Sequence, residues 1–273
     1  MSAGPEKSPR PEAFAIDLDG VVWLSREPIA GSIEALGALR ASGRSLVFVT
    51  NDPRSTRAEL AARLTELGAP TGPDEIVTSA RVTAHAVAAH HPGARVLSIG
   101  TPSLESELAE LGLRPLGPDR EDVAEPGAVV AVVVGGGGRF DFDVLRIAAA
   151  AVRNGAELWA TNKDPTYPTA TGLVPGTGAI VAAIEVASAA EARNVGKPGP
   201  ALFDDAVQLL GVGAPERTLM AGDSLHSDIA GAAAAGLATA LILTGRDSRA
   251  DIPAAPVAPD LVFDDLAALA AAV

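Results

Sequence analysis

An apolar segment near the start of the chain contains two acidic residues and a glycine: Phe14-Ala15-Ile16-Asp17-Leu18-Asp19-Gly20-Val21. A short apolar run that ends in a turn signal is typical of a buried central strand in a parallel α/β sheet. Gly20 follows the acids directly and lets the backbone turn sharply. Ligands bind beyond the carboxyl ends of the strands in such sheets, so Asp17 and Asp19 lie where chemistry is expected.

Asp17 and Asp19 face the same side of an extended chain, because residues i and i+2 share one face of a strand. Two carboxylates this close repel each other, and a divalent cation is the simplest partner for them. The alternative is a strand that ends in Asp and continues into an ordinary Asp-Gly turn. This segment alone leaves both interpretations open.

The composition indicates a globular protein, because 48% of the 273 residues are hydrophobic and 20% are charged. A net charge of −13 argues against general binding to nucleic acids or to anionic membranes. A small anionic substrate is still allowed, since a bound cation and a local Lys or Arg override the overall charge. The chain has no cysteine, which excludes disulfides and thiolate chemistry and fits a cytoplasmic location.

Apolar runs alternate with segments of helical periodicity, which predicts a parallel sheet covered by helices. Ser55 or Thr56 is expected to cap the helix that follows.

Residues 1–11 are polar and contain proline, so we expect a disordered tail and no signal peptide. The Pro-, Thr- and Gly-rich residues 166–178 predict a structured loop. Strands are predicted at 45–49, 95–100, 129–134, 158–160, 218–221, 239–243 and 261–263, and helices at 33–39, 79–90, 104–111, 144–152, 180–190, 201–210 and 228–235.

Polar side chains occur in or beside four predicted loops, three of which follow strongly apolar strands: Asp17 with Asp19, Thr50 with Asn51, Lys197, and Asp223 with Asp228. The loops at the carboxyl ends of parallel strands open on one edge of the sheet, so these residues can converge. This set suits the cleavage of phosphate esters. A carboxylate can attack phosphorus, neighbouring carboxylates can hold Mg²⁺, and a hydroxyl with an ammonium can neutralise the phosphoryl oxygens.

Four motifs, in this order, resemble those of the haloacid dehalogenase (HAD) superfamily: Asp17-Leu18-Asp19-Gly20-Val21, Val49-Thr50-Asn51, Gly196-Lys197-Pro198 and Gly222-Asp223 with Asp228. The segments 160–165, 176–180 and 132–135 resemble the NagD-like subgroup, which includes phosphoglycolate and glycerol-phosphate phosphatases. The resemblance implies an α/β fold with a Rossmann-like parallel-sheet core, 12–80 and 193–273. A large α/β cap domain, 81–192, is inserted into that core and is expected to close over it.

The resemblance also implies roles for the four acidic residues. Asp17 would be the nucleophile, and Asp19 would be the general acid and base. Mg²⁺ would be bound by Asp17, by the backbone carbonyl of Asp19 and by Asp223. Asp228 would support the metal site, although the residues alone leave a helix N-cap as its alternative role. Gly20 would support the turn beside the two acids.

The phosphoryl group, by the same resemblance, would be bound by Thr50, Asn51 and Lys197, with Lys197 bridging it to the nucleophile. Asp52 departs from the subgroup, whose second motif usually reads Thr-Asn-Asn. Its extra negative charge either alters substrate preference or points away from the site. Ser224 follows Asp223 where the subgroup more often has a basic residue, which leaves the contacts to the leaving group open.

The predicted cap contributes weaker candidates. Arg139 follows the glycines 135–138, which lack the Lys-Ser/Thr that a nucleotide-binding P-loop needs. We expect a flexible turn there, from which Arg139 can reach a substrate. Asn162 and Asp164 follow a predicted strand and either face the substrate or brace the loop behind them. His226 is expected to face solvent, because two aspartates already supply the acid and base chemistry.

The sequence as a whole predicts a Mg²⁺-dependent phosphatase of small phosphate monoesters that works through an aspartyl-phosphate. Glycerol 3-phosphate is the first candidate substrate and 2-phosphoglycolate the second, with nucleotide and sugar phosphates as further alternatives. Another HAD reaction, such as phosphate transfer or carbon–halogen cleavage, and a non-enzymatic binding module are the rival hypotheses. The oligomeric state is left open, a homodimer included.

Overall fold

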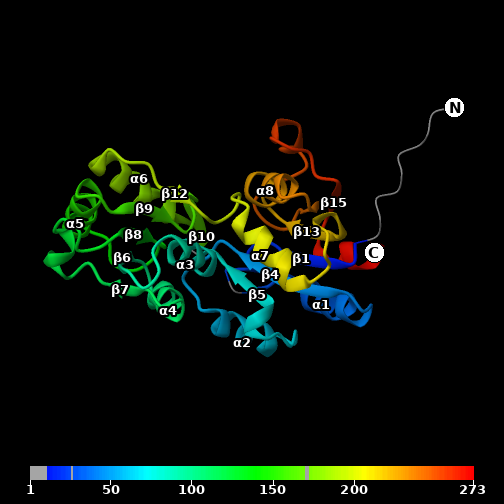
Figure 1. Ribbon diagram of the computed structural model, residues 1–273. Helices are drawn as coiled ribbons and strands as arrows, with labels where there is room; N and C mark the ends of the chain where they lie inside the picture. Colours follow the sequence, from blue (N-terminus) through cyan, green and yellow to red (C-terminus); the bar gives the residue numbers. More distant parts are fainter. Residues whose placement is uncertain (1–10, 26, 170–171) are drawn as a thin grey trace. The chain divides into compact units, whose positions relative to one another are not determined.

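The computed structural model describes residues 11–25, 27–169 and 172–273 (Figure 1). The predicted tail over residues 1–11 therefore lies, except for Pro11, outside the described residues. The chain divides into two compact units. The first contains the residues up to Val49, Thr65–Pro70 and Phe203–Val273, and the second contains Thr50–Leu64 and Thr71–Leu202. The predicted cap, 81–192, falls within the second unit, and its proposed boundaries stay a prediction.

The first unit is built on parallel strands in the order β15-β14-β13-β1-β4. The central strand β1 is buried at every residue, as its apolar sequence predicts, and Phe14 and Ile16 are fully enclosed. Val49 is the register partner of Asp17, and Ala221 is the partner of Ile16. Asp17 and Asp223 therefore lie at the carboxyl ends of adjacent strands. The bounds are β1 (Ala13–Asp17), β4 (Ser45–Thr50), β13 (Thr218–Gly222), β14 (Ala238–Ile242) and β15 (Leu261–Phe263).

Helices and one small hairpin complete the first unit. Among them α1 packs against α9. The elements are the hairpin β2 (Trp23–Leu24) and β3 (Glu27–Pro28), the helices α1 (Ser32–Ala41), α8 (Gly231–Ala234) and α9 (Leu266–Ala272), the π-helix η4 (Leu225–Ala230), and the short 3₁₀ turns η3 (Pro215–Arg217) and η5 (Ile252–Ala254). Two helices, α2 (Arg57–Glu66) and α7 (Ala201–Leu210), contain points where the chain passes from one unit to the other.

The prediction of an α-helix at 228–235 is wrong both about where the helix begins and about its type. A π-helix occupies Leu225–Ala230, and α8 follows it. The Ser224 hydroxyl accepts a hydrogen bond from the Ser227 N–H at 3.2 Å, so Ser224 is the N-cap and the turn begins earlier. Asp228 is therefore not a helix N-cap. Its Oδ2 accepts a hydrogen bond from the Ser224 N–H at 3.0 Å, from inside the turn.

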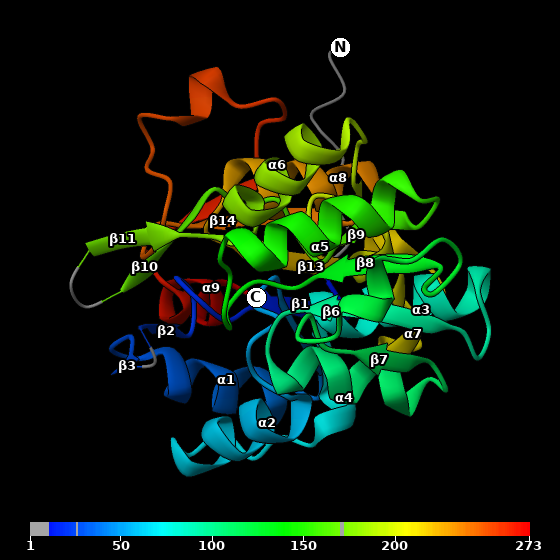
Figure 2. The same ribbon diagram turned by 90° about the vertical axis from the view of Figure 1, so that its left-hand side faces the viewer.

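The second unit contains a five-stranded parallel sheet in the order β12-β9-β8-β6-β7. Its core is formed largely by valine, leucine and alanine from β6, β8, β9, α5 and α6, and the last two helices lie side by side (Figure 2). The strands of this sheet are β6 (Arg95–Ile99), β7 (Arg114–Leu116), β8 (Ala131–Val134), β9 (Glu157–Ala160) and β12 (Arg193–Asn194). The unit also contains β5 (Ile76–Thr78), which is not part of this sheet. The helices are α3 (Ser79–His90), α4 (Pro102–Glu110), α5 (Phe142–Arg153) and α6 (Thr177–Ser188), with the turns η1 (Pro73–Glu75) and η2 (Glu121–Ala124).

The segment 166–178, predicted as a loop, is instead mostly an antiparallel hairpin of β10 (Thr166–Thr169) and β11 (Gly172–Pro175). Thr and Tyr favour an extended chain, and a two-stranded ribbon tolerates proline at its edges. Helix α6 then begins at Thr177, earlier than the predicted residue 180. Strands β5, β7 and β12 were not predicted, because strands of two or three residues carry little periodicity; among strands this short only β15 was predicted.

The cap predicted at Ser55 or Thr56 is found at the start of α2. Thr56 and Glu59 form a reciprocal cap at the start of α2: the Thr56 N–H donates to the Glu59 carboxylate at 2.8 Å, and the Glu59 N–H donates to the Thr56 hydroxyl at 3.1 Å. This confirms Thr56 as the cap.

Within the described part of the chain, no helix combines the length and the apolar character needed to cross a membrane.

Candidate functional site

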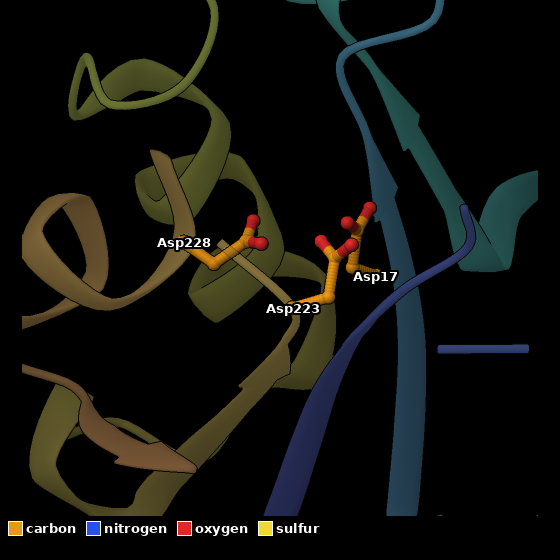
Figure 3. A group of neighbouring side chains, drawn as sticks. All are labelled: Asp17, Asp223 and Asp228. Carbon is orange, nitrogen blue, oxygen red and sulfur yellow. The ribbon is translucent and has the colours of Figure 1, made fainter. Parts of the chain in front are cut away.

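Three carboxylates of the first unit gather at the carboxyl ends of β1 and β13 (Figure 3). Asp17 ends β1, Asp223 follows β13, and Asp228 lies in the π-helix η4. One oxygen from each residue lies within 4.8 Å of the other two. The three side chains are largely enclosed, with 7%, 9% and 0% of the surface of Asp17, Asp223 and Asp228 exposed.

Three enclosed carboxylates at this spacing repel one another strongly, because little water screens their charges. A divalent cation relieves this repulsion, and a set of carboxylate oxygens is the donor set that Mg²⁺ and Ca²⁺ prefer. The group therefore fits a hard divalent metal. Sequence reasoning placed Asp17 and Asp223 on the metal, and the structure adds the Asp228 carboxylate to the same group.

Asp223 is held by the loop that follows β14. The Arg246 N–H donates to Asp223 Oδ2 at 2.7 Å, and the Asp247 N–H donates to the Asp223 carbonyl at 3.1 Å. Asp247 Oδ2 in turn accepts a hydrogen bond from the Leu225 N–H at 2.6 Å. Sequence reasoning missed this loop, although its place after a parallel strand at the same sheet edge was a usable signal.

Two glycines make room for the Asp223 carboxylate. A Cβ on Gly20 would lie 2.0 Å from Asp223 Oδ2, and a Cβ on Gly245 would lie 1.9 Å from the same atom. Gly20 also has a φ of +87°, which favours glycine independently of the contact. Thr244 Oγ1 donates to the Gly20 carbonyl at 2.6 Å and joins the two glycine-containing loops. The backbones of Gly20 and Gly245 therefore pack closely against the Asp223 carboxylate and fix its position.

Asp19 is only partly buried, and its carboxylate does not belong to the acidic group found among the described residues. Its Oδ1 accepts a hydrogen bond from Trp23 Nε1 at 3.1 Å. Asp17 Oδ1 accepts from the Leu18 N–H at 2.9 Å. The two acids of the first motif thus have different surroundings, Asp17 with the enclosed carboxylates and Asp19 beside an indole.

Asn51 is hydrogen-bonded to three other candidate residues of the second unit, Lys197, Asp164 and Asn162. Its Oδ1 accepts from the Lys197 N–H at 2.8 Å, and its Nδ2 donates to the Lys197 carbonyl at 3.0 Å. The same Nδ2 lies 3.1 Å from Asp164 Oδ2. Lys197 is 3% exposed, an unusual degree of burial for a lysine. The side-chain amide of Asn51 therefore binds the backbone of Lys197, a residue 146 positions later in the sequence.

The Asn51 carbonyl accepts two further hydrogen bonds, from Ser79 Oγ at 2.7 Å and from Asn162 Nδ2 at 2.8 Å. Asn162 Oδ1 also accepts from the Asp164 N–H at 3.1 Å. In this structure Asn162 and Asp164 brace Asn51. Ser79 was missed by sequence reasoning, since a serine at the start of a helix carries no signal beyond helix capping.

Thr50 is 2% exposed and ends β4, and its Oγ1 accepts from the Asp52 N–H at 3.0 Å. The Asp52 carboxylate pairs with Arg54 through two hydrogen bonds, Nε to Oδ1 at 2.7 Å and Nη2 to Oδ2 at 2.8 Å. The Asp52 hydrogen bond raises the pKa of the Arg54 guanidinium well above its usual value. The extra carboxylate of the second motif is therefore neutralised by a neighbour three residues from Asn51.

The remaining candidates lie at the surface or serve local structure. Arg139 has 66% of its side chain exposed and pairs with Asp141 and Asp119. The hydrogen bond to Asp141 raises the pKa of Arg139. His226 is exposed, as predicted. Ser224 is buried, and its hydroxyl caps η4, so this departure from the subgroup's pattern has a local structural use.

Family models match two parts of the sequence. Residues 14–114 match a model described as haloacid dehalogenase-like hydrolase. Residues 194–269 match a second one, described as HAD-hydrolase-like. Together these ranges include all four predicted motifs.

Individual proteins are similar over nearly the whole chain. D-glycerol 3-phosphate phosphatase of Mycobacterium tuberculosis is 42% identical over 261 residues, which is 94% of this chain and 70% of that protein. The crystal structure of glycerol phosphate phosphatase from the same organism, in complex with magnesium, has a TM-score of 0.87 at 39% identity and covers 96% of this chain and 77% of its own. A p-nitrophenyl phosphatase from Archaeoglobus fulgidus has a TM-score of 0.88 at 31% identity, covering 97% of this chain and 100% of its own.

Proposed function

The chain belongs to the haloacid dehalogenase-like hydrolases and is a phosphatase, and from this premise we propose that it hydrolyses glycerol 3-phosphate with Mg²⁺ through an aspartyl-phosphate. The observation that carries the proposal is the group formed by Asp17, Asp223 and Asp228. Its oxygen donors suit a divalent metal, and Asp17 is the member that the family motif identifies as the nucleophile. The similarity to glycerol phosphate phosphatases supports the choice of substrate.

In the first step an Asp17 carboxylate oxygen attacks phosphorus, and the bond between phosphorus and the ester oxygen breaks. The leaving alkoxide takes a proton from Asp19 and departs as glycerol. Asp19 suits this role because it is partly exposed and can exchange protons with solvent. The hydrogen bond from Trp23 Nε1 orients its carboxyl group.

In the second step Asp19, now a carboxylate, accepts a proton from a water molecule as that water attacks phosphorus. The bond between phosphorus and Asp17 breaks, so inorganic phosphate leaves and the Asp17 carboxylate is restored. Both steps use the same two aspartates, and Asp19 returns to its protonated state at the end of the cycle.

Thr50, Asn51 and Lys197 bind the phosphoryl oxygens in this proposal. Burial of Lys197 strengthens the attraction of its ammonium for an anion, because little water competes with it. Asp17 and Asp223, with the Asp19 carbonyl and the support of Asp228, would hold Mg²⁺. When bound, the metal supplies positive charge that screens the nucleophile from the phosphate dianion.

A phosphate-release assay tests the proposal. In the presence of Mg²⁺ the protein is expected to release phosphate from glycerol 3-phosphate at least about tenfold more efficiently than from 2-phosphoglycolate or a sugar phosphate. Chelation with EDTA is expected to lower the release by at least about tenfold, and added Mg²⁺ to restore it. Equal activity with and without the metal would contradict the metal assignment. Preference for another ester would overturn only the choice of substrate.

Gly245→Ala is expected to weaken Mg²⁺ binding by at least about tenfold, because the new methyl group forces the Asp223 carboxylate out of place. Isothermal titration of Mg²⁺ without substrate measures this directly. Gly37→Ala is the matched control, since its Cβ would meet nothing within 4 Å and the residue lies in helix α1. The control should keep the wild-type affinity for Mg²⁺ and gain about 0.5–1 kcal/mol of stability. An unchanged affinity in Gly245→Ala would show that the Asp223 position is not critical.

A further inference from the structure

Asp52 and Arg54, on the loop that contains Asn51, form a cluster with Tyr167 of β10. The Asp52 carboxylate accepts from Arg54 Nε at 2.7 Å, from Nη2 at 2.8 Å and from the Arg54 N–H at 3.0 Å. On its other side the Arg54 guanidinium lies over the Tyr167 ring, 4.1 Å from the centroid. The guanidinium is thus fixed in plane and in position from two sides, by a two-point ion pair and by a ring.

The cluster lies close to the residue that we propose binds the phosphoryl group. Arg54 follows Asn51 by three residues, which limits the separation of their Cα atoms to about 11 Å. Tyr167 lies on β10, and Asp164, three residues earlier, is hydrogen-bonded to Asn51. The loop 50–54 and the start of the hairpin are therefore connected at both Asn51 and Arg54.

The ion pair decides which charge a substrate meets beside this loop. An arginine without a carboxylate partner would attract a second anionic group on the substrate, through charge-assisted hydrogen bonds. Here Asp52 already occupies the Nε–Nη2 edge of the Arg54 guanidinium and neutralises its charge. A second anion would compete with Asp52 for the guanidinium and would be repelled by the Asp52 carboxylate. A neutral polyol neither competes with Asp52 for the guanidinium nor is repelled by the Asp52 carboxylate.

We propose that the Asp52–Arg54 pair makes this site selective for phosphate esters with a neutral leaving group and against esters with a second anionic group. The inference rests on the proposed phosphatase function and deepens it. It predicts that the enzyme prefers glycerol 3-phosphate over 2-phosphoglycolate because the latter carries a carboxylate one carbon from the ester oxygen. Asp52 and Arg54 are specificity-determining residues in this account and take no part in the chemical steps.

A double-mutant cycle tests this inference with uncharged, similarly shaped replacements. The measured quantity is kcat/KM for 2-phosphoglycolate divided by kcat/KM for glycerol 3-phosphate. Asp52→Asn leaves the guanidinium without its counter-charge and is expected to raise the ratio about tenfold. Arg54→Gln leaves the carboxylate unopposed and is expected to lower the ratio about tenfold. The double variant is neutral again, and its ratio should return to within about threefold of the wild type. Both shifts should shrink as NaCl is raised.

A merely structural role of the pair has a different signature, because a displaced loop or hairpin would reduce activity toward both substrates and leave their ratio unchanged. An unchanged ratio in Asp52→Asn or in Arg54→Gln, with phosphate release intact, overturns the inference and leaves the phosphatase function standing. Since the two single variants are expected to move the ratio in opposite directions, either one that folds, as judged by its melting temperature, provides the test. A wild-type protein that releases phosphate from neither ester would instead refute the proposed function.

Discussion

Asp17→Asn is expected to lower kcat by at least about 10⁴-fold, because an amide cannot attack phosphorus and form the phosphoenzyme. The fold should survive, since asparagine has the same shape and its amide oxygen can still accept the Leu18 N–H that bonds to Asp17 Oδ1 at 2.9 Å. Steady-state phosphate release measures the loss. Acid quenching with a ³²P-labelled substrate measures the intermediate, which should label the wild type and not the variant.

Asp119→Asn is the matched control for this substitution. Asp119 is an exposed carboxylate, 84% accessible, that pairs at the surface with Arg139. Its neutralisation changes the net charge by the same amount as Asp17→Asn and should leave kcat within about twofold. Near-normal turnover by Asp17→Asn, or label retained on that variant, would refute the assignment of the nucleophile.

Lys197→Met is expected to lower kcat/KM by about 10²–10³-fold. The substitution removes the ammonium from an enclosed site, where its attraction for a phosphoryl group is least screened by water. It should leave the local structure in place, because the bonds from Asn51 to the backbone N–H and carbonyl of Lys197 survive the substitution. The buried methionine replaces the stem of lysine with a chain of similar length.

Lys163→Met is the matched control, because it makes the same substitution at a different lysine. Lys163 is about one-third exposed, and its ammonium pairs with Glu185 of α6 at 2.7 Å. Its loss should change kcat/KM by less than about twofold and stability only slightly. If Lys197→Met behaves like this control, Lys197 is not a phosphoryl-binding residue. Melting temperatures of both variants separate a loss of function from a loss of fold.

The sequence predicted the α/β fold and the family, and both are confirmed by the family models and the related structures. Most of the longer elements were predicted to within three residues, and α3, α7 and β15 were predicted without error. These successes share a cause. Apolar runs and helical periodicities are local, and a parallel sheet places the residues that follow its strands at one edge.

The wrong predictions also share a cause, which is that a distant or irregular contact overrides local preference. Residues 166–169 and 172–175 have the composition of a loop, and the pairing between these two segments makes them extended. The π-helix at 225–230 depends on the bonds of Ser224 with Ser227 and Asp228. A helical pattern in sequence does not contain that information.

The sequence by itself determined the family, the order of the motifs and the identity of the acids, because residue type and spacing are properties of the chain alone. Only the tertiary structure decided what each side chain contacts. It placed Asp228 in the acidic group, tied Asn51 to Lys197, closed the loop of Gly245 and Arg246 around Asp223, and turned the charge of Asp52 toward Arg54. Most of these contacts join residues that are far apart in sequence, and the guanidinium of the neighbouring pair also lies over the ring of Tyr167. Such contacts form when packing brings the residues to the same place, and no local pattern records where that place is.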